Sequence, residues 1–153
     1  MRKLAEALYL AVIALWVGGL WAIGYLVAPV LFSSLGDRQL AGMVAGKLFA
    51  LIGWVGLGIA AYLVIFLITR WGGQVFKRAV FWLVILMATM VAASQFGIQP
   101  LMAQLKVDAL PREVMESVLR DRFAAWHGIS SILYLMQSLL GLWLVVWSGR
   151  GLR

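Results

Sequence analysis

The stretch AVFWLVILMATMVAASQFGIQPLMAQL, from Ala79 to Leu105, contains no charged residue. A helix needs about 20 apolar residues to cross the roughly 30 Å hydrocarbon core of a bilayer, so this stretch is long enough to span a membrane. It lacks the alternation of polar and apolar residues that is typical of strands in a transmembrane barrel. Inside lipid such a run can satisfy its own backbone hydrogen bonds only as an α-helix. We therefore predict a transmembrane helix here.

Charged residues divide the rest of the chain into three more uncharged stretches, Ala7 to Gly36, Leu48 to Thr69 and Phe123 to Gly149. The first is far longer than the roughly 7 to 15 apolar residues of a signal peptide, so we interpret it as a retained span. The sequence thus predicts one all-α domain over residues 1–153, an integral membrane four-helix bundle. The predicted spans cover about 7–32, 48–69, 79–103 and 123–148.

The composition supports a membrane environment. Hydrophobic residues make up 64% of the chain and charged residues 12%, whereas soluble domains carry about 25% charged residues. The net charge is +7, but the basic residues stand in small groups at the ends of apolar runs. That placement favours the lipid bilayer as partner and argues against nucleic acid. The absence of cysteine excludes disulfides and thiolate metal sites.

Four spans place both chain ends on one side of the membrane. Compact basic clusters remain in the cytoplasm, whereas the opposite side mixes bases and acids, so we expect both termini to be cytoplasmic in a bacterial inner membrane. The basic residues of the predicted cytoplasmic side are Arg2, Lys3, Arg70, Lys77, Arg78, Arg150 and Arg153, with Glu6 as the only acid.

The connection between spans three and four, Leu110 to Arg122, is predicted to form a short amphipathic helix along the outer membrane surface. Pro111 suits a first helical position, and Asp108 could cap the helix. The residues expected on its apolar face are Val114, Val118 and Leu119.

His127, the sole histidine, lies about one turn into the last span. An ionisable group at membrane depth is by default a functional hypothesis, although a neutral histidine can also serve as an interhelical hydrogen bond. We predict a polar pocket in the outer half of the bundle around it. Pro29 either ends the first helix or kinks it and turns carbonyl groups towards the His127 level. The candidate ligand-binding residues are His127, Gln95, Gln99, Tyr134 and Pro29.

Small residues form a second pattern, in which Gly42 and Gly46 are four positions apart. Such spacing lets helix backbones approach closely, so we expect spans one and two to pack against each other. The residues assigned to this packing are Gly18, Gly19, Gly42, Gly46 and Gly53.

These features favour a non-enzymatic protein that binds or passes a small solute, lipid or metal. No span contains an acid, so a Ser/His/Asp constellation cannot form in the membrane, and we assign no catalytic residue and no cofactor. His127 is the only metal-ligand candidate. A haem-binding redox carrier is a remote alternative, because its second axial ligand would have to come from a second copy or from a methionine. A structural or accessory subunit, as a homo-oligomer or with a membrane partner, is the other alternative.

Three strings in the first half of the chain carry a family resemblance: LWVGG from Leu15 to Gly19, APVLF from Ala28 to Phe32, and AGMVAGKLF from Ala41 to Phe49. With His127 between Trp126 and Gly128, they resemble the transmembrane protein 205-like group of small four-span membrane proteins, a domain of unknown function. The resemblance implies a compact four-helix membrane bundle and supplies no reaction, cofactor or substrate.

Overall fold

The computed structural model describes residues 2–151, and every regular element among them is helical. In chain order these elements are α1 (Arg2–Trp21), the π-helical η1 (Ala22–Val27), α2 (Ala28–Ser34), α3 (Arg38–Trp71), the 3-10 helical η2 (Gly72–Lys77), α4 (Ala79–Ala93), the π-helical η3 (Ser94–Ile98), α5 (Gln99–Asp108), the 3-10 helical η4 (Val114–Glu116) and α6 (Arg120–Gly151).

Four continuous helical segments are long and apolar enough to cross a membrane, which confirms the prediction of an all-α chain with four such helices. The second segment begins at Arg38, well before the predicted start at residue 48, because Asp37 caps it. The Asp37 carboxylate accepts the N–H groups of Gln39 and Leu40 over 2.8 and 3.1 Å. The four segments are Lys3–Ser34, Arg38–Lys77, Ala79–Asp108 and Arg120–Gly149.

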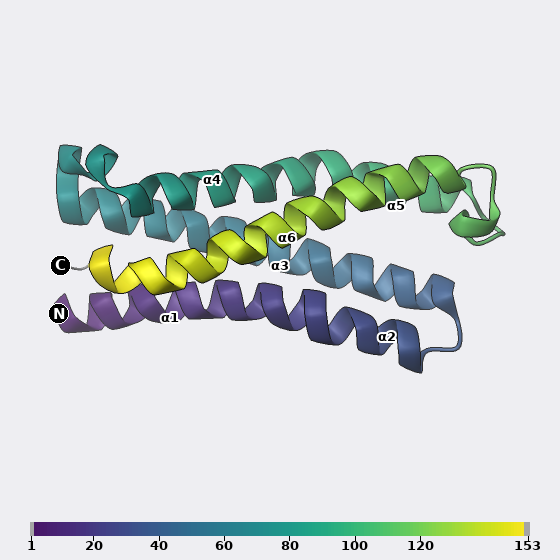
Figure 1. The fold of residues 1–153 in the computed structure, drawn as a ribbon, viewed down its shortest axis with the longest axis horizontal. Helices are drawn as coiled ribbons and strands as arrows, with labels where there is room; N and C mark the ends of the chain where they lie inside the picture. Colours follow the sequence, from purple (N-terminus) through teal and green to yellow (C-terminus); the bar gives the residue numbers. More distant parts are fainter. Residues whose placement is uncertain (1, 152–153) are drawn as a thin grey trace.

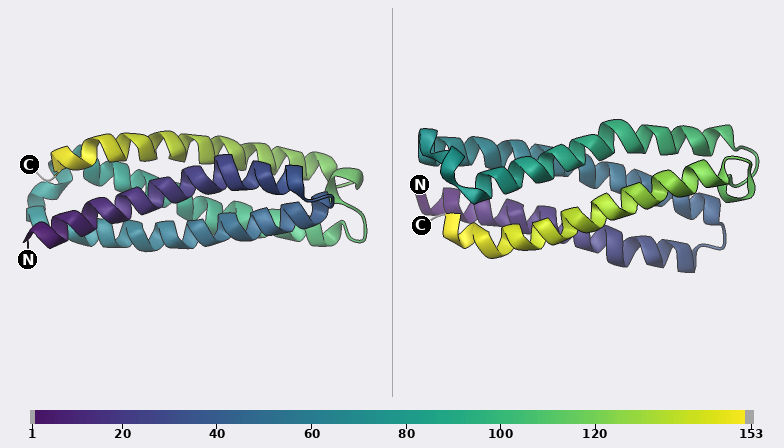
Figure 2. Two further views of the ribbon diagram at one scale, coloured as in Figure 1. Left: turned by 90° about the horizontal axis from the view of Figure 1, so that it is seen from below. Right: turned by 45° about the horizontal axis from the view of Figure 1, so that its top comes forward.

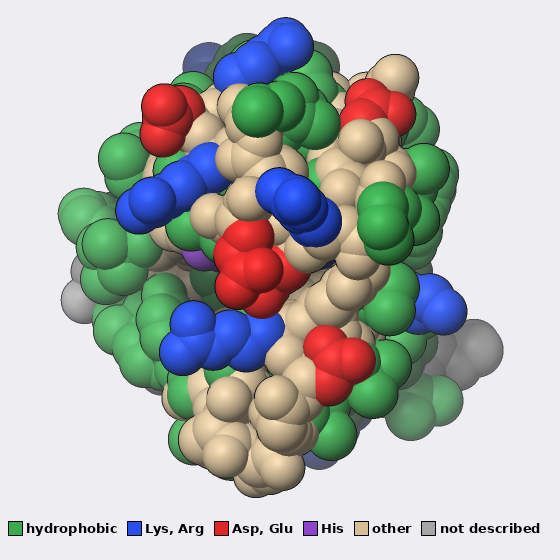
Figure 3. Space-filling view, turned by 90° about the vertical axis from the view of Figure 1, so that its right-hand side faces the viewer, with side chains coloured by type: hydrophobic (Ala, Val, Ile, Leu, Met, Phe, Trp, Pro, Cys, Tyr) green, Lys and Arg blue, Asp and Glu red, His purple; other side chains and the backbone are tan. Residues whose placement is uncertain are grey.

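The four segments lie side by side (Figures 1 and 2). Helix α1 packs against α3 and α6, and α4 packs against the same two helices from the other side. The start of α1, the end of α6 and the η2 turn lie at one end of the molecule (Figure 1). The opposite end carries the turns around residues 35–37 and 109–119, and there acidic and basic side chains are interleaved (Figure 3).

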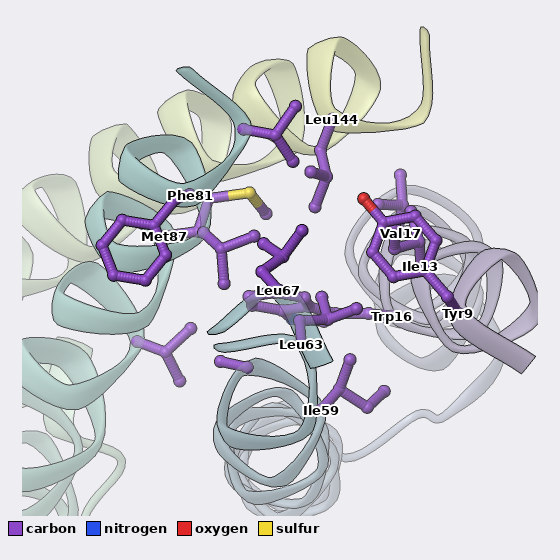
Figure 4. Packing of buried hydrophobic residues seen from close by; sticks show 14 of the residues in the cluster. Tyr9, Ile13, Trp16, Val17, Ile59, Leu63, Leu67, Phe81, Met87 and Leu144 are labelled. Atoms are coloured by element: carbon purple, nitrogen blue, oxygen red, sulfur yellow. The ribbon is translucent and has the colours of Figure 1, made fainter. Parts of the chain in front are cut away.

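The buried core lies towards the first of these ends, where side chains from all four segments point at one another (Figure 4). Tyr9 and Trp16 of α1 are completely buried, as are Leu63, Met87 and Leu144 of the other helices. Around this core the outer surface is strongly apolar. Many large hydrophobic side chains are exposed on it, which is compatible with contact with lipid and costly in water.

The predicted amphipathic helix from Leu110 to Arg122 is wrong. Asp108 is the last residue of α5 rather than a cap, and only the 3-10 turn η4 follows before α6 begins. Ser117 explains the difference, because its hydroxyl donates to the Val114 carbonyl over 2.8 Å and accepts the Leu119 N–H over 3.1 Å. Such side-chain bonds compete with helical ones. Val114 is buried while Val118 is 98% exposed, so the expected apolar face does not form.

Candidate functional site

Tyr134 of α6 is hydrogen-bonded to the backbone of the first span. Its hydroxyl donates to the Leu20 carbonyl over 2.6 Å and also interacts with the backbone of Gly24. In an α-helix the Leu20 carbonyl would accept the N–H of Gly24, four residues later. The tyrosine hydroxyl therefore lies beside the two backbone groups that an α-helical hydrogen bond would join.

Gly24 provides the space for this contact. A Cβ atom at this position would collide with the Tyr134 ring. The ring also packs edge-on against Phe49 and Tyr25, with centroid distances of 5.1 and 6.2 Å. Aromatic neighbours on α3 and η1 thus hold the Tyr134 hydroxyl in place against α1.

Both π-helical segments end two residues before a proline. Segment η1 precedes Pro29, and η3 precedes Pro100. A proline ring clashes with the carbonyl four residues earlier and offers no N–H, and a wider turn moves that carbonyl aside. The helix therefore continues through Pro29 to Ser34 instead of ending there. Isolated π-helical turns are frequent at functional sites.

Gln95 lies within η3 and is buried. Its side-chain amide donates to the Ala50 carbonyl of α3 over 3.1 Å, and the amide oxygen packs directly against Gly53. A buried amide in an apolar environment requires such a partner. Gln95 consequently joins the third span to the second by a polar contact.

The Tyr134 ring contacts Phe49, and the Gln95 amide donates to the carbonyl of Ala50. Phe49 and Ala50 are adjacent residues of α3, so the two side chains lie at one level of the molecule. We call these two side chains with the segments η1 and η3 the polar layer. Among the remaining candidates, Pro29 is exposed just beyond η1. Gln99 is half-buried one turn beyond Gln95 and makes no side-chain hydrogen bond within the described part of the chain.

His127 does not belong to the polar layer. It precedes Tyr134 by two turns of α6, about 10 Å along the helix, and its side chain is exposed. Its ring stacks on Phe123 at a centroid distance of 5.9 Å, and its carbonyl accepts the Ser131 hydroxyl. The structure therefore places the histidine on the rim, near the end of the molecule that carries the turns around residues 35–37 and 109–119.

Lys106 of α5 is a polar group that the sequence interpretation did not single out. Its ammonium donates to the Gly42 carbonyl over 3.0 Å and lies 5.6 Å from the centre of the Phe123 ring. Phe123 thus contacts both Lys106 and His127. The sequence held one indication of this contact. Lys106 follows a long apolar run, and a long basic side chain at such a position can turn back along the helix surface.

The glycines proposed for packing between the first two spans fall into three groups. Gly19 meets Ile52 of α3, where an added Cβ would lie 2.6 Å from the Ile52 Cδ1 atom. Gly46 instead faces the Lys106 ammonium, and Gly53 faces Gln95. A Cβ at Gly42 would lie 3.9 Å both from the Lys106 ammonium and from the Phe32 ring of the first span. A Cβ at Gly18 would meet no atom within 4 Å.

Besides the Arg70 Nε atom, three buried side-chain polar atoms have no hydrogen-bond partner among the described residues: the Tyr9 hydroxyl, the Trp16 indole nitrogen and the Gln137 amide nitrogen. They lie on α1 and α6, and none was selected from the sequence. Gln137 carries the same signal as Gln95, an amide within an apolar span, and could have been selected. For Tyr9 and Trp16 only burial in the fold distinguishes these atoms.

Within the described residues, no group of three or more His, Asp or Glu side chains is placed to hold a metal ion. Two shallow hollows lie apart from the polar layer. One is lined by α6 residues from Leu139 to Trp147, and the other by residues from Asp108 to Leu119.

Taken together, the four apolar helices define an all-α chain compatible with a multi-pass membrane protein. The chain belongs to the family described as Domain of unknown function (DUF4149), whose model matches residues 11–110. The match covers α3, α4, α5 and the first span from residue 11 onwards, whereas α6 with Tyr134 and His127 lies beyond it. No curated protein and no solved structure matches the chain.

Proposed function

We propose that this chain is a non-enzymatic protein of the bacterial inner membrane that binds or passes a small solute, lipid or metal through the outer half of its helices. In this proposal the polar layer is the ligand-contacting element, and His127 is a contact on its outer rim. The narrower relationship to the transmembrane protein 205-like group belongs to the same proposal, supported by the strings around Gly18, Pro29 and Gly46.

The observation that carries the proposal is the Tyr134 hydroxyl, bonded to the Leu20 carbonyl beside a π-helical turn. In the hydrocarbon region a polar side chain and an irregular backbone are both costly, and they occur together where they line a site. Gln95 adds an amide beside the second π-helical segment. Hydroxyl, amide and carbonyl groups at one level suit a ligand that itself forms hydrogen bonds.

We further propose that the four helices form a transmembrane bundle with both termini in the cytoplasm. The position of the start of α1 and the end of α6 at one end of the molecule supports this arrangement (Figure 1). The described basic residues Lys3, Arg70, Lys77 and Arg78 belong to the same end, and such clusters remain cytoplasmic.

The test uses a host that lacks the gene and is complemented with full-length variants. Tyr134→Phe removes the hydroxyl alone, and Tyr62→Phe is the matched control, because Tyr62 makes no side-chain hydrogen bond within the described residues. We expect Tyr134→Phe to alter the growth response to Cu²⁺ or to a panel of small solutes, while Tyr62→Phe behaves as the parent. Equal behaviour of both variants at equal protein levels would refute the polar layer as a ligand site.

His127→Ala tests the outer rim separately. If His127 contacts the ligand, this variant accumulates normally and shares the altered response of Tyr134→Phe. An unchanged response in His127→Ala alone would remove the histidine from the site and leave the polar layer in place.

A second candidate function is that of an accessory subunit. The hollow on α6 favours it, because the large apolar side chains of Leu139, Leu142, Trp143 and Val146 are exposed around it. Such a surface could receive an apolar helix of a membrane partner. Purification in mild detergent tests this function: a protein that always runs as a lone monomer without a co-purifying chain would contradict it.

A further inference from the structure

Two arginines share one tryptophan at the end of the molecule that carries η2. The guanidinium carbon of Arg78 lies 3.6 Å from the centre of the Trp71 ring, and that of Arg70 lies 5.8 Å from it. Arg78 is therefore stacked on the indole, and Arg70 is its neighbour. Both guanidinium groups thus reach the same indole ring, although the η2 turn separates the two arginines in the sequence.

The turn itself explains this approach. Gly72 ends α3 with a φ of 52°, in the left-handed region that favours glycine, and η2 follows immediately. Val75 is completely buried and fixes η2 to the helices, and its carbonyl accepts the Arg78 N–H over 2.9 Å. The backbone thus returns Arg78 to the tryptophan that precedes the turn.

Negative charge is scarce around this pair. One nitrogen of Arg70 lies 3.3 Å from the Glu6 carboxylate, but its Nε atom is buried without a hydrogen-bond partner among the described residues. Arg78 has no ion pair in the same set, and the exposed Lys77 is next to it. At the opposite end, acidic side chains lie among the basic ones (Figure 3). The arginine pair therefore carries an excess of positive charge.

A stacked guanidinium uses its face and keeps its N–H edge free. That planar edge matches the oxygens of a phosphate and binds them bidentately. We propose that Arg78, stacked on Trp71 and with Arg70 beside the same ring, binds the phosphate of an anionic phospholipid headgroup. Lys77 contributes long-range attraction to the same leaflet.

A lipid suits the site better than free phosphate because of the aromatic side chains beside it. Phe76 and Trp82 are 59% and 55% exposed, and the Trp82 indole donates to the Phe76 carbonyl over 2.9 Å. Exposed aromatic rings of this kind lie at the level of lipid headgroups. A phosphate bound to the arginines can thus carry acyl chains that run along the apolar surface of α4.

The experiment uses the full-length protein in mild detergent, with retained lipid detected by native mass spectrometry. The probes are short-chain phosphatidylglycerol, phosphatidylcholine of the same chain length, and inorganic phosphate. The choline cation of phosphatidylcholine cancels the charge of its phosphate, and inorganic phosphate has no acyl chains to lie on the apolar surface. We therefore expect phosphatidylglycerol to bind about tenfold or more tightly than either other probe. Arg78→Gln should abolish this preference. Arg78→Lys, which keeps the charge but not the planar edge, should retain only part of it.

Arg112→Gln is the matched control, because Arg112 is an exposed arginine at the opposite, mixed-charge end. It should bind phosphatidylglycerol as the parent does, and gel filtration should show all variants as folded, monodisperse protein. Equal binding of the two lipids by the parent, equal losses in Arg78→Gln and Arg112→Gln, or binding of inorganic phosphate as tight as that of the lipid would each overturn the proposal.

Discussion

The indole nitrogen of Trp16 packs directly against Gly56, where an added Cβ atom would lie only 2.6 Å from it. Trp16 is completely buried between α1 and its neighbours, so it has little freedom to move away. This contact fixes the separation of the first two spans at their centre.

We therefore expect Gly56→Ala to destabilise the protein by about 1 to 3 kcal/mol, the usual cost of overfilling a packed core. Gly58→Ala is the control, since a Cβ there would meet no atom within 4 Å. Thermal unfolding in detergent measures both variants. Similar midpoints for the two would contradict the close contact of Trp16 with α3.

Tyr134→Phe removes one hydrogen bond between α6 and the first span. Interhelical hydrogen bonds in membranes contribute about 0.6 to 1.7 kcal/mol, so we expect a loss of about 1 kcal/mol in unfolding free energy. Tyr62→Phe should leave the stability nearly unchanged. A parent-like stability of Tyr134→Phe would show that its hydroxyl bond to Leu20 contributes nothing to stability.

Lys106→Met should also destabilise the protein by about 1 kcal/mol, because it keeps the long stem but loses the bond to Gly42 and the contact with the Phe123 ring. The matched control is Lys47→Met, which removes an exposed lysine of α3. Both variants are measured by unfolding in detergent. If the two substitutions lower the unfolding free energy equally, the Lys106 hydrogen bond does not contribute to stability.

Reporter fusions test the proposed topology. Green fluorescent protein fused after Arg153 should fluoresce, and alkaline phosphatase at the same position should be inactive, because the C-terminus is expected in the cytoplasm. Active phosphatase at this position would show that the C-terminus lies on the opposite side of the membrane. Fusions at the turn around Gly36 should give the opposite pair of signals.

The four long helices could be predicted because apolar length alone determines them. The connection after Asp108 could not, since the Ser117 hydroxyl offers the backbone an alternative to the helix that the apolar spacing suggested. Helix spacing indicates which residues share a face but not which neighbour that face meets. Gly53 was accordingly assigned to contact with the first span, although it faces Gln95 of η3.

The candidate site was predictable in residue type more than in arrangement. Tyr134 and Gln95 were selected as polar groups in apolar spans, and both make hydrogen bonds to a neighbouring helix. The partner carbonyls of Leu20 and Ala50 are backbone groups, for which the sequence gives no signal. His127 was grouped with them by depth, but depth does not specify the direction of a side chain on its helix.

Each π-helical segment adds about one residue to its turn, which corresponds to about 100° of rotation around the helix axis. A single helical wheel drawn through Lys3–Ser34 or Ala79–Asp108 therefore assigns the residues after Val27 or Ile98 to the wrong side by more than a quarter of the circumference. In these two spans the direction in which α2 and α5 point their side chains is determined by the wide turns that precede them. Lys106 can face α3 for this reason, and the faces of α2 and α5 continue those of α1 and α4 only after this rotation.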